Sequence, residues 1–192
     1  MLKHIQIRKA KQEDAKALAG LLFLAMEDII YHFIGVEKEE EAIRFLHHFT
    51  QRKNNQYSFE NCYVAEVEEE IVAAINIYDG AKLKGLRFPI ENYIDQHYKS
   101  NYILENETEA GEYYIDSIAV RADLRGSGVG TKLLKHTINI YSSKNRQTIG
   151  LLVECTNPDA KRLYLKLGFI VVGTKILAGK KLEHLMREEV KT

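Results

Sequence analysis

The sequence predicts an α/β fold made of one domain, residues 1–192. The clearest observation is the order of patterns after residue 112, where strand-like and helical segments alternate. A second observation is the length, because 192 residues correspond to roughly one domain at about 150 residues each. No internal repeat, heptad array or low-complexity linker divides the sequence. We therefore expect one compact domain.

The first 80 residues predict two strands around two helices, and then a third strand. Residues 4–8 alternate enough for a short strand. The next segment places apolar residues three and four positions apart, which predicts one buried helical face: Ala15, Leu18, Leu22, Ala25, Met26, Ile29 and Phe33. A second helix is expected over residues 37–52, then strands over 62–67 and 71–78. The acidic residues 68–70 are expected to form a solvated hairpin turn between those strands.

The regular pattern weakens over residues 80–111. Pro89 is expected to open a short helix that reaches residue 98, because proline is tolerated in a first helical turn. The segment is too long for a simple hairpin loop, and such insertions are often functional. Tyr93 and His97 give it aromatic and polar contacts. We favour a flap on the substrate side over a mobile decoration.

The remaining elements follow in clear order. They are strands over residues 112–120 and 149–155, helices over 128–141 and 158–167, and two final strands over 169–177 and 182–190 with a turn at Gly179.

Charge and hydropathy limit the partners. Lys plus Arg and Asp plus Glu each number 27, so the net charge is zero and no nucleic-acid or membrane partner is expected. The apolar stretch 15–34 contains Lys16, Glu27 and Asp28, which a membrane span would rarely tolerate. No secretion signal is visible, so a cytoplasmic protein is expected.

The two cysteines predict neither a metal site nor a redox motif. Cys62 and Cys155 are too far apart in the sequence for the usual ligand spacing. We expect both to be buried thiols in a reducing compartment, and we expect no metal.

The sharpest local motif is the glycine-rich segment 125–131, which lies between a strand and an amphipathic helix. Glycines allow a ligand to approach the backbone, and the helix that follows offers free N–H groups and its positive dipole end. This combination favours an anion-binding cradle, with a tight strand-to-helix turn as the alternative. The spacing fits neither the Rossmann pattern, which needs glycine where Thr131 stands, nor the P-loop.

Four segments together resemble the GNAT superfamily of N-acetyltransferases. They are Ile118-Ala119-Val120, the loop from Arg125 to Gly130, Asn157-Pro158-Asp159-Ala160, and Tyr164-Leu165-Lys166-Leu167-Gly168-Phe169. The resemblance is strong over residues 112–169 and extends in element order to the whole chain. It implies an α+β sandwich-like fold with a central mixed, mostly antiparallel sheet flanked by helices.

The same resemblance implies acetyl-CoA as cosubstrate. Its pantetheine arm would lie along the backbone of Ile118, Ala119 and Val120. Its pyrophosphate would be held by donors from the loop: Arg125, Gly126, Ser127, Gly128, Val129, Gly130 and Thr131. Asn157 would bind the pantetheine, although an asparagine before a proline is also a good helix N-cap.

Three residues are candidates for catalysis. Tyr164 matches the family tyrosine that protonates the departing CoA sulfur, and a phenol with a pKa of about 10 is protonated at neutral pH. Its alternative role is packing against the sheet. Glu112 is our first choice for the general base and Asp116 the second. Period-two geometry places both on one strand face with Tyr114, Ile118 and Val120, unless a bulge changes the register.

We therefore expect an acetyl-CoA-dependent N-acetyltransferase that transfers an acetyl group by direct attack of a primary amine. The acceptor would be a small molecule or an amine on a peptide or protein. The alternative from another class is a non-catalytic acyl-CoA-binding or sensing module, and a nucleotide-phosphate enzyme is disfavoured by the missing motif lysine. A homodimer stays open.

Overall fold

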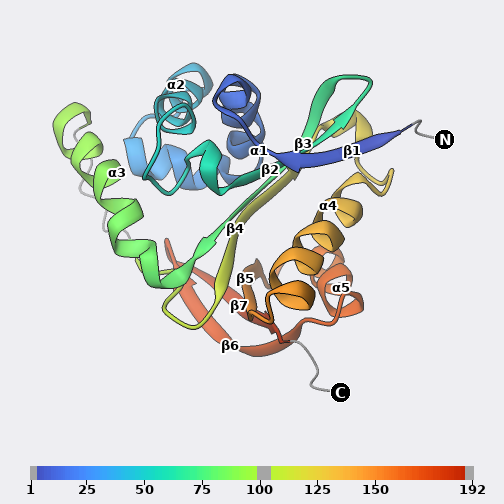
Figure 1. Ribbon diagram of the computed structural model, residues 1–192. Coiled ribbons are helices and arrows are strands. Elements are labelled where there is room, and N and C mark those ends of the chain that lie inside the picture. Colours follow the sequence, from blue (N-terminus) through green and yellow to red (C-terminus); the bar gives the residue numbers. More distant parts are fainter. Residues whose placement is uncertain (1–3, 99–104, 189–192) are drawn as a thin grey trace.

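A seven-stranded sheet runs through the computed structural model, which describes residues 4–98 and 105–188 (Figure 1). Its strand order is β1-β2-β3-β4-β5-β7-β6. The strands are β1 (Ile5–Lys9), β2 (Cys62–Val67), β3 (Glu70–Asp79), β4 (Tyr113–Val120), β5 (Ile149–Glu154), β6 (Ile170–Leu177) and β7 (Lys180–Arg187). Among these described strands, β4 and β5 alone pair in parallel. The expected mixed, mostly antiparallel sheet is confirmed.

Helices cover both faces of this sheet. They are α1 (Ala15–Ile34), α2 (Glu39–Thr50), α3 (Leu83–His97), α4 (Val129–Ile138) and α5 (Pro158–Lys166). The helices α1 and α2 lie on one face, and α4 and α5 lie on the other (Figure 1). Apolar side chains fill both interfaces: Ile75, Leu133 and Leu185 beneath α4 and α5, and Leu22, Phe45 and Ile90 among α1, α2 and α3.

Helix α1 belongs to the core of the fold. By length and composition alone, Gln12–Ile34 could also cross a membrane, which is weak evidence because a core helix passes the same test. Leu18, Leu22 and Ile30 are almost fully buried against the sheet and the neighbouring helices. The helix kinks at Met26, where φ is −135° and ψ is 26°. Its second half therefore takes a new direction.

Helix α3 corrects one expectation. It begins at Leu83, so Pro89 lies inside the helix rather than in its first turn. The buried residues Leu83, Arg87, Ile90 and Ile94 share one helical face. Because Arg87 is charged, it interrupts the apolar periodicity that would otherwise have revealed the first turns of α3. Part of the expected insertion, residues 99–104, lies outside the described residues.

The expected hairpin turns are confirmed. Glu68 and Glu69, with φ of 51° and 67°, connect β2 to β3. Ala178 and Gly179, with φ of 49° and 73°, connect β6 to β7. Positive φ at both central residues is the conformation of a two-residue hairpin loop that matches strand twist.

Three further expectations change at their ends or in burial. Helix α4 ends at Ile138, and a π-helical turn, Asn139–Lys144, follows it directly. Strand β7 begins two residues before the expected 182, and the expected end at residue 190 lies outside the described residues. Cys62 is buried, and burial raises the pKa of its thiol to about 12. Cys155 is exposed, contrary to the expectation, because it directly follows the last residue of β5.

Candidate active site

A bulge in β4 sets the geometry of the site. In the pairing with β3, Asn76 lies opposite Ser117 and Ile77 opposite Ile115, so Asp116 is an extra residue without a Cα partner. The parallel ladder with β5 also ends there, since it joins residues 113–115 to 149–151 only. Beyond this point β5 continues to pair with β7 and β4 with β3. The two strands therefore separate immediately after Ile115.

The bulge also changes which side chains share a face. Without it, alternation would keep Tyr114, Asp116, Ile118 and Val120 together, as period-two geometry predicts. In the structure Tyr114 and Asp116 line a pocket, whereas Ile118 and Val120 pack into the core beneath α4. The expected single face is therefore wrong, and the bulge is the reason.

The pocket has a volume of about 220 Å³ and is assembled from distant parts of the chain. Helix α1, strands β4 and β5, helix α3 and the β6–β7 hairpin all contribute to its lining. The polar and charged lining residues are Asp28, His32, Gln56, Arg87, Glu105, Glu107, Asp116, Glu154 and Lys180. The apolar and aromatic ones are Met26, Ile29, Phe33, Tyr57, Tyr114, Leu177, Ala178 and Leu182.

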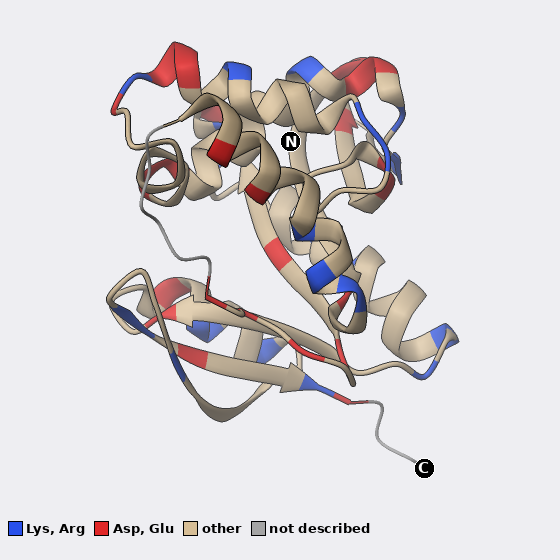
Figure 2. Ribbon diagram, turned by 90° about the vertical axis from the view of Figure 1, so that its left-hand side faces the viewer, with Lys and Arg blue, Asp and Glu red and all other residues tan. Residues whose placement is uncertain are grey.

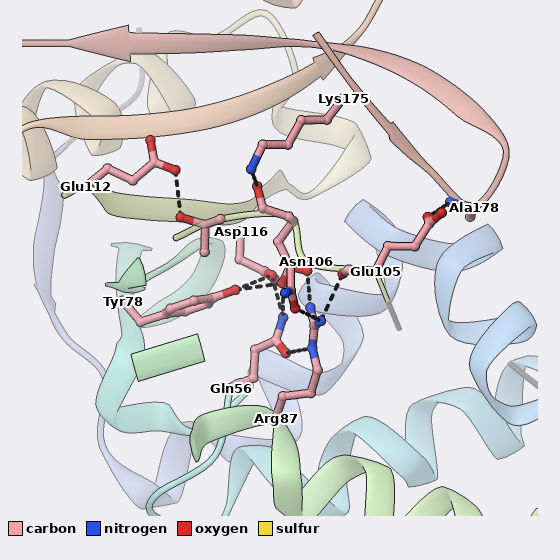
Figure 3. Close-up of polar contacts among 11 residues, drawn as sticks. Gln56, Tyr78, Arg87, Glu105, Asn106, Glu112, Asp116, Lys175 and Ala178 are labelled. Carbon is pink, nitrogen blue, oxygen red and sulfur yellow. Dashed lines mark hydrogen bonds and ion pairs between the residues drawn. The ribbon is translucent and has the colours of Figure 1, made fainter. Parts of the chain in front are cut away.

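Several lining residues of this pocket belong to one hydrogen-bonded cluster (Figure 3). The Gln56 side-chain amide donates to Glu107 Oε1 and to Asp116 Oδ1, both at 2.8 Å. The Tyr78 hydroxyl donates to the same two oxygens at 2.9 and 3.2 Å. Arg87 forms a buried ion pair with Glu107 and donates to the Glu105 carbonyl at 2.9 Å. One oxygen of Asp116 is thus held by two donors.

The other oxygen of Asp116 differs from the first in its surroundings. Asp116 Oδ2 is buried and has no hydrogen-bond partner among the described residues. Burial, and then the nearby Glu107 carboxylate, raises the pKa of Asp116 to about 7, whereas the bonds from Gln56 and Tyr78 act in the opposite direction. A carboxylate whose pKa is near neutral can both accept and release a proton at physiological pH.

Glu112 lies elsewhere, outside the pocket lining. Its Oε2 is 2.8 Å from His184 Nε2, and its Oε1 accepts a hydrogen bond from Thr108 at 2.6 Å. The side chain passes over Gly150, where a Cβ would lie only 1.6 Å from Glu112 Oε2. Glu112 therefore links β4 to β7 across β5, and the structure brings Asp116 rather than Glu112 to the pocket.

The glycine-rich loop has the geometry of an anion cradle. Gly126 and Gly128 have φ of 77° and 88°, which favour glycine, and a Cβ at either position would meet open space. At Gly130 a Cβ would lie 3.1 Å from Val120, so the helix can pack closely on β4. Val129 begins α4, whose first-turn N–H groups, including those of Gly130 and Thr131, have no partner within the helix.

The other loop residues have different surroundings. Arg125 is exposed at the entrance of the loop, and its N–H donates to the Ala122 carbonyl at 3.3 Å. Both the N–H and the hydroxyl of Ser127 donate to the Leu124 carbonyl. Ile118, Ala119 and Val120 lie in the part of β4 that has separated from β5, so their backbone borders the opening between the strands.

Asn157 is the N-cap of α5. Its side-chain oxygen accepts a hydrogen bond from the Ala160 N–H at 3.1 Å, and Pro158 occupies the first helical turn. The capping role weighed from the sequence is therefore confirmed. A pantetheine contact stays a prediction.

Tyr164 is a buried residue of α5. Its ring packs edge-on against Phe169, with the ring centroids 5.9 Å apart, so the alternative packing role is real. Burial raises the pKa of its phenol to about 12, which keeps the hydroxyl protonated in neutral solution. Packing and proton donation are compatible, because packing uses the ring and donation uses the hydroxyl.

Sequence reasoning missed the residues that surround Asp116. Gln56, Tyr78, Arg87 and Glu107 lie in four separate segments without a common motif. The one usable signal was Arg87, a charged residue on the inner face of a helix, which calls for a buried partner. Among the described residues there is no cluster of three or more His, Cys, Asp or Glu side chains able to hold a metal.

Comparison with known proteins decides the family. A family model described as "Acetyltransferase (GNAT) family" matches residues 26–169, which is most of the chain and includes Asp116 and the glycine-rich loop. The chain belongs to the GNAT acetyltransferase family. This confirms the resemblance stated from the sequence, and it makes the protein an acyltransferase by family.

Solved structures of acetyltransferases share the GNAT fold of this chain. The crystal structure of an acetyltransferase has a TM-score of 0.81 and 28% identity, covering 95% of this chain and 98% of the other. An N-acetyltransferase from Staphylococcus aureus Mu50 has a TM-score of 0.83 and 26% identity, covering 94% and 99%. The PaiA N-acetyltransferase from Thermoplasma acidophilum, solved with coenzyme A, matches at 0.58 and 16% over 97% and 100%. At 16% identity, the match to the PaiA structure shows a shared fold alone.

The residues of this GNAT protein fit acetyl-CoA, which family membership implies. The positive φ of Gly126 and Gly128 turns the loop back toward the start of α4, where free N–H groups suit a diphosphate. Between the bulge and this loop, the backbone of β4 is not paired with β5. The loop and this part of β4 are thus both suited to hold the cosubstrate.

Proposed function

We propose that this protein is an acetyl-CoA-dependent N-acetyltransferase whose acceptor is a primary amine bound in the pocket beside Asp116. The observation that carries the proposal is the Asp116 carboxylate. One of its oxygens is fixed by Gln56 and Tyr78, and the other is buried and without a hydrogen-bond partner among the described residues, directly after the point where β4 and β5 separate. Acetyl-CoA, when bound, would supply the acetyl group as a thioester.

Asp116 has the properties that a general base needs here. A primary amine has a pKa near that of lysine, about 10.4, so it arrives mainly as an ammonium ion. The Asp116 oxygen without a partner can accept a proton from that ammonium, and a pKa of about 7 leaves it mostly ionised above neutral pH. As the general base, Asp116 is therefore preferred over Glu112, because the Glu112 carboxylate is already bound to His184.

Tyr164 is proposed as the acid. Its phenol keeps its proton throughout the neutral range because burial raises the pKa to about 12. It can therefore donate that proton to the sulfur of the departing CoA. The segment from Ile118 to Val120 and the loop from Arg125 to Thr131 are proposed to bind the cosubstrate, with Asn157 at the start of α5 beside it.

The test is acetyl transfer itself. Purified protein is mixed with acetyl-CoA and a panel of amines that includes alkylamines, arylalkylamines, amino acids and a peptide with a free N-terminus, while thiol release is followed. Product mass must increase by one acetyl group. Binding of acetyl-CoA is measured in parallel by calorimetry.

The outcomes separate the candidate functions. Amine-dependent thiol release with an acetylated product supports the proposal. Tight acetyl-CoA binding without transfer to any amine of the panel would overturn it in favour of a binding or sensing module. Absence of both binding and transfer would also remove the cosubstrate assignment.

A further inference from the structure

The pocket beside Asp116 carries information about the acceptor that goes beyond the presence of an amine. It has two chemically different parts. The inner end holds the hydrogen-bonded cluster of Asp116, and the outer part is formed by α1 and the β6–β7 hairpin. The two parts place separate demands on an acceptor.

Apolar side chains form one wall of the outer part. Met26, Ile29 and Phe33 come from α1, beginning at its kink, and Leu177 and Leu182 come from the hairpin strands. A wall of this kind stabilises an apolar group through burial. The space is also limited, because the whole pocket measures about 220 Å³. A hydrocarbon-lined cavity of about 150 Å³ holds benzene, so one ring with a short arm is a suitable size.

The pocket carries more acidic than basic side chains, and its basic side chains are already paired. It therefore favours a cationic ligand over an anionic one. Five carboxylates line the pocket: Asp28, Glu105, Glu107, Asp116 and Glu154. The two described lining residues with permanent positive charge already have acidic partners. Arg87 pairs with Glu107, and Lys180 pairs with Asp28 at 3.0 Å and with Glu154 at 3.1 Å.

His32 also lines the pocket, but it is exposed and so offers no buried counter-charge to an anion. Figure 2 shows acidic and basic residues interspersed along the helices and the hairpin. An acceptor carboxylate would thus be buried in the pocket without a counter-charge.

We propose that the acceptor is a primary amine with a single apolar or aromatic body and without a carboxylate next to the amine. This inference rests on the proposed N-acetyltransferase function and names its substrate class. The amine lies at Asp116, the apolar body lies against α1 and the hairpin, and a carboxylate is rejected because its desolvation is not compensated. Free amino acids are therefore poor acceptors.

The experiment compares molecules that differ in one group. The acceptors are 2-phenylethylamine, L-phenylalanine and L-phenylalaninamide, assayed at pH 8 with saturating acetyl-CoA. The amide has the same bulk as the amino acid without its charge. We expect kcat/KM for 2-phenylethylamine to exceed that for phenylalanine by at least about 100-fold, with the amide closer to the amine.

A second comparison tests the apolar body. Hexylamine and 1,6-diaminohexane have the same chain length, but the diamine carries a second positive charge. We expect hexylamine to be the better acceptor, because Asp28 and Glu154 are already paired with Lys180 and a second ammonium buried against the apolar wall would lack a counter-charge. A preference for the diamine of more than about tenfold would overturn the inference.

A variant can restore tolerance of the carboxylate. The double variant D28N/E154Q removes both acidic partners of Lys180 and leaves its ammonium uncompensated at the pocket rim. We expect the ratio of kcat/KM for 2-phenylethylamine to that for phenylalanine to fall by about fivefold to tenfold, a modest change because Lys180 is partly exposed. The control E60Q breaks an ion pair with Lys53 outside the pocket lining and should leave the ratio unchanged.

The results distinguish failure of the inference from failure of the function. Transfer to phenylalanine as fast as to 2-phenylethylamine overturns the substrate class and leaves the acetyltransferase proposal intact. The same holds if only the peptide is acetylated. Absence of transfer to every amine overturns the proposed function, and the inference with it.

Discussion

At the scale of single residues, two carboxylates, one in β4 and one directly before it, have different surroundings. Glu112 meets His184 and Thr108, and both of its oxygens are engaged. Asp116 has donors on one oxygen only, and burial near Glu107 raises its pKa to about 7. Fixing one oxygen orients the carboxylate, and leaving the other free lets it accept a proton. This is the arrangement expected of a base rather than of a structural ion pair.

Replacement of these two carboxylates by their amides separates the roles. We expect D116N to lower kcat/KM for the best amine by about 100-fold or more at pH 8, because an amide cannot accept the proton. E112Q should lower it by less than about tenfold, since glutamine still bonds Thr108 or His184. Loss of activity in E112Q with retention in D116N would reverse the assignment.

The pH profile gives an independent measure of Asp116. A base must be ionised, so the wild-type advantage over D116N should shrink as pH falls below about 7, by up to tenfold per unit. Protonation of the amine affects both proteins equally, and the ratio of their kcat/KM values removes it. A ratio that is constant from pH 6 to pH 9 would argue against Asp116 as the base.

Tyr164 can be tested without disturbing its packing. Y164F keeps the ring that packs on Phe169 and removes only the hydroxyl. We expect kcat to fall by about tenfold to 100-fold, while the Kd for acetyl-CoA changes by less than about threefold. The measurements are steady-state kinetics and calorimetry. An unchanged kcat would remove Tyr164 from the mechanism and leave it a packing residue.

At the scale of elements, the local patterns predict most strands and helices because they repeat with the period of the structure. Two features escape that reasoning for physical reasons. The first turns of α3 are concealed because Arg87 occupies a buried position of the helical face, where its charge is paired by Glu107 from a distant segment. The bulge at Asp116 leaves no mark on the sequence, since it depends on pairing with β3. That bulge turns Ile118 and Val120 away from the side on which Tyr114 and Asp116 line the pocket.

The turn from β4 to α4 gives a prediction at this scale. In G128E the new side chain enters open space, but a non-glycine residue at φ +88° is strained and a carboxylate then lies at the helix N-terminus. We expect the Kd of CoA, measured by calorimetry, to rise by at least about tenfold. G128N is the matched control, because asparagine tolerates this conformation and adds no charge. Equal affinities in wild type and G128E would remove the loop from the CoA site.

At the scale of the whole molecule, the pocket exists only because distant parts of the chain meet. Gln56 precedes β2, Arg87 lies in α3, Glu107 precedes β4, and Lys180 belongs to β7. No motif joins these residues, and Arg87 alone carries a local signal, so the sequence could indicate the cosubstrate loop and Tyr164 through a motif but not the acceptor pocket. The sheet runs through both halves of the chain, which supports one acetyltransferase domain.

The burial of Asp116 should also be visible in the stability of the whole protein. Its pKa is raised from an ordinary value near 3.8 to about 7 in the folded state, so the folded protein binds the proton more tightly than the unfolded chain does. The sign follows directly: this group favours folding at low pH, and its contribution becomes unfavourable as pH rises from about 4 to about 7. D116N has no such titration. We therefore expect the Tm of D116N minus that of wild type to be larger at pH 8 than at pH 5, measured by differential scanning calorimetry without ligand. A difference independent of pH would mean that the carboxylate is ionised at both pH values in the folded protein, and that burial does not raise its pKa.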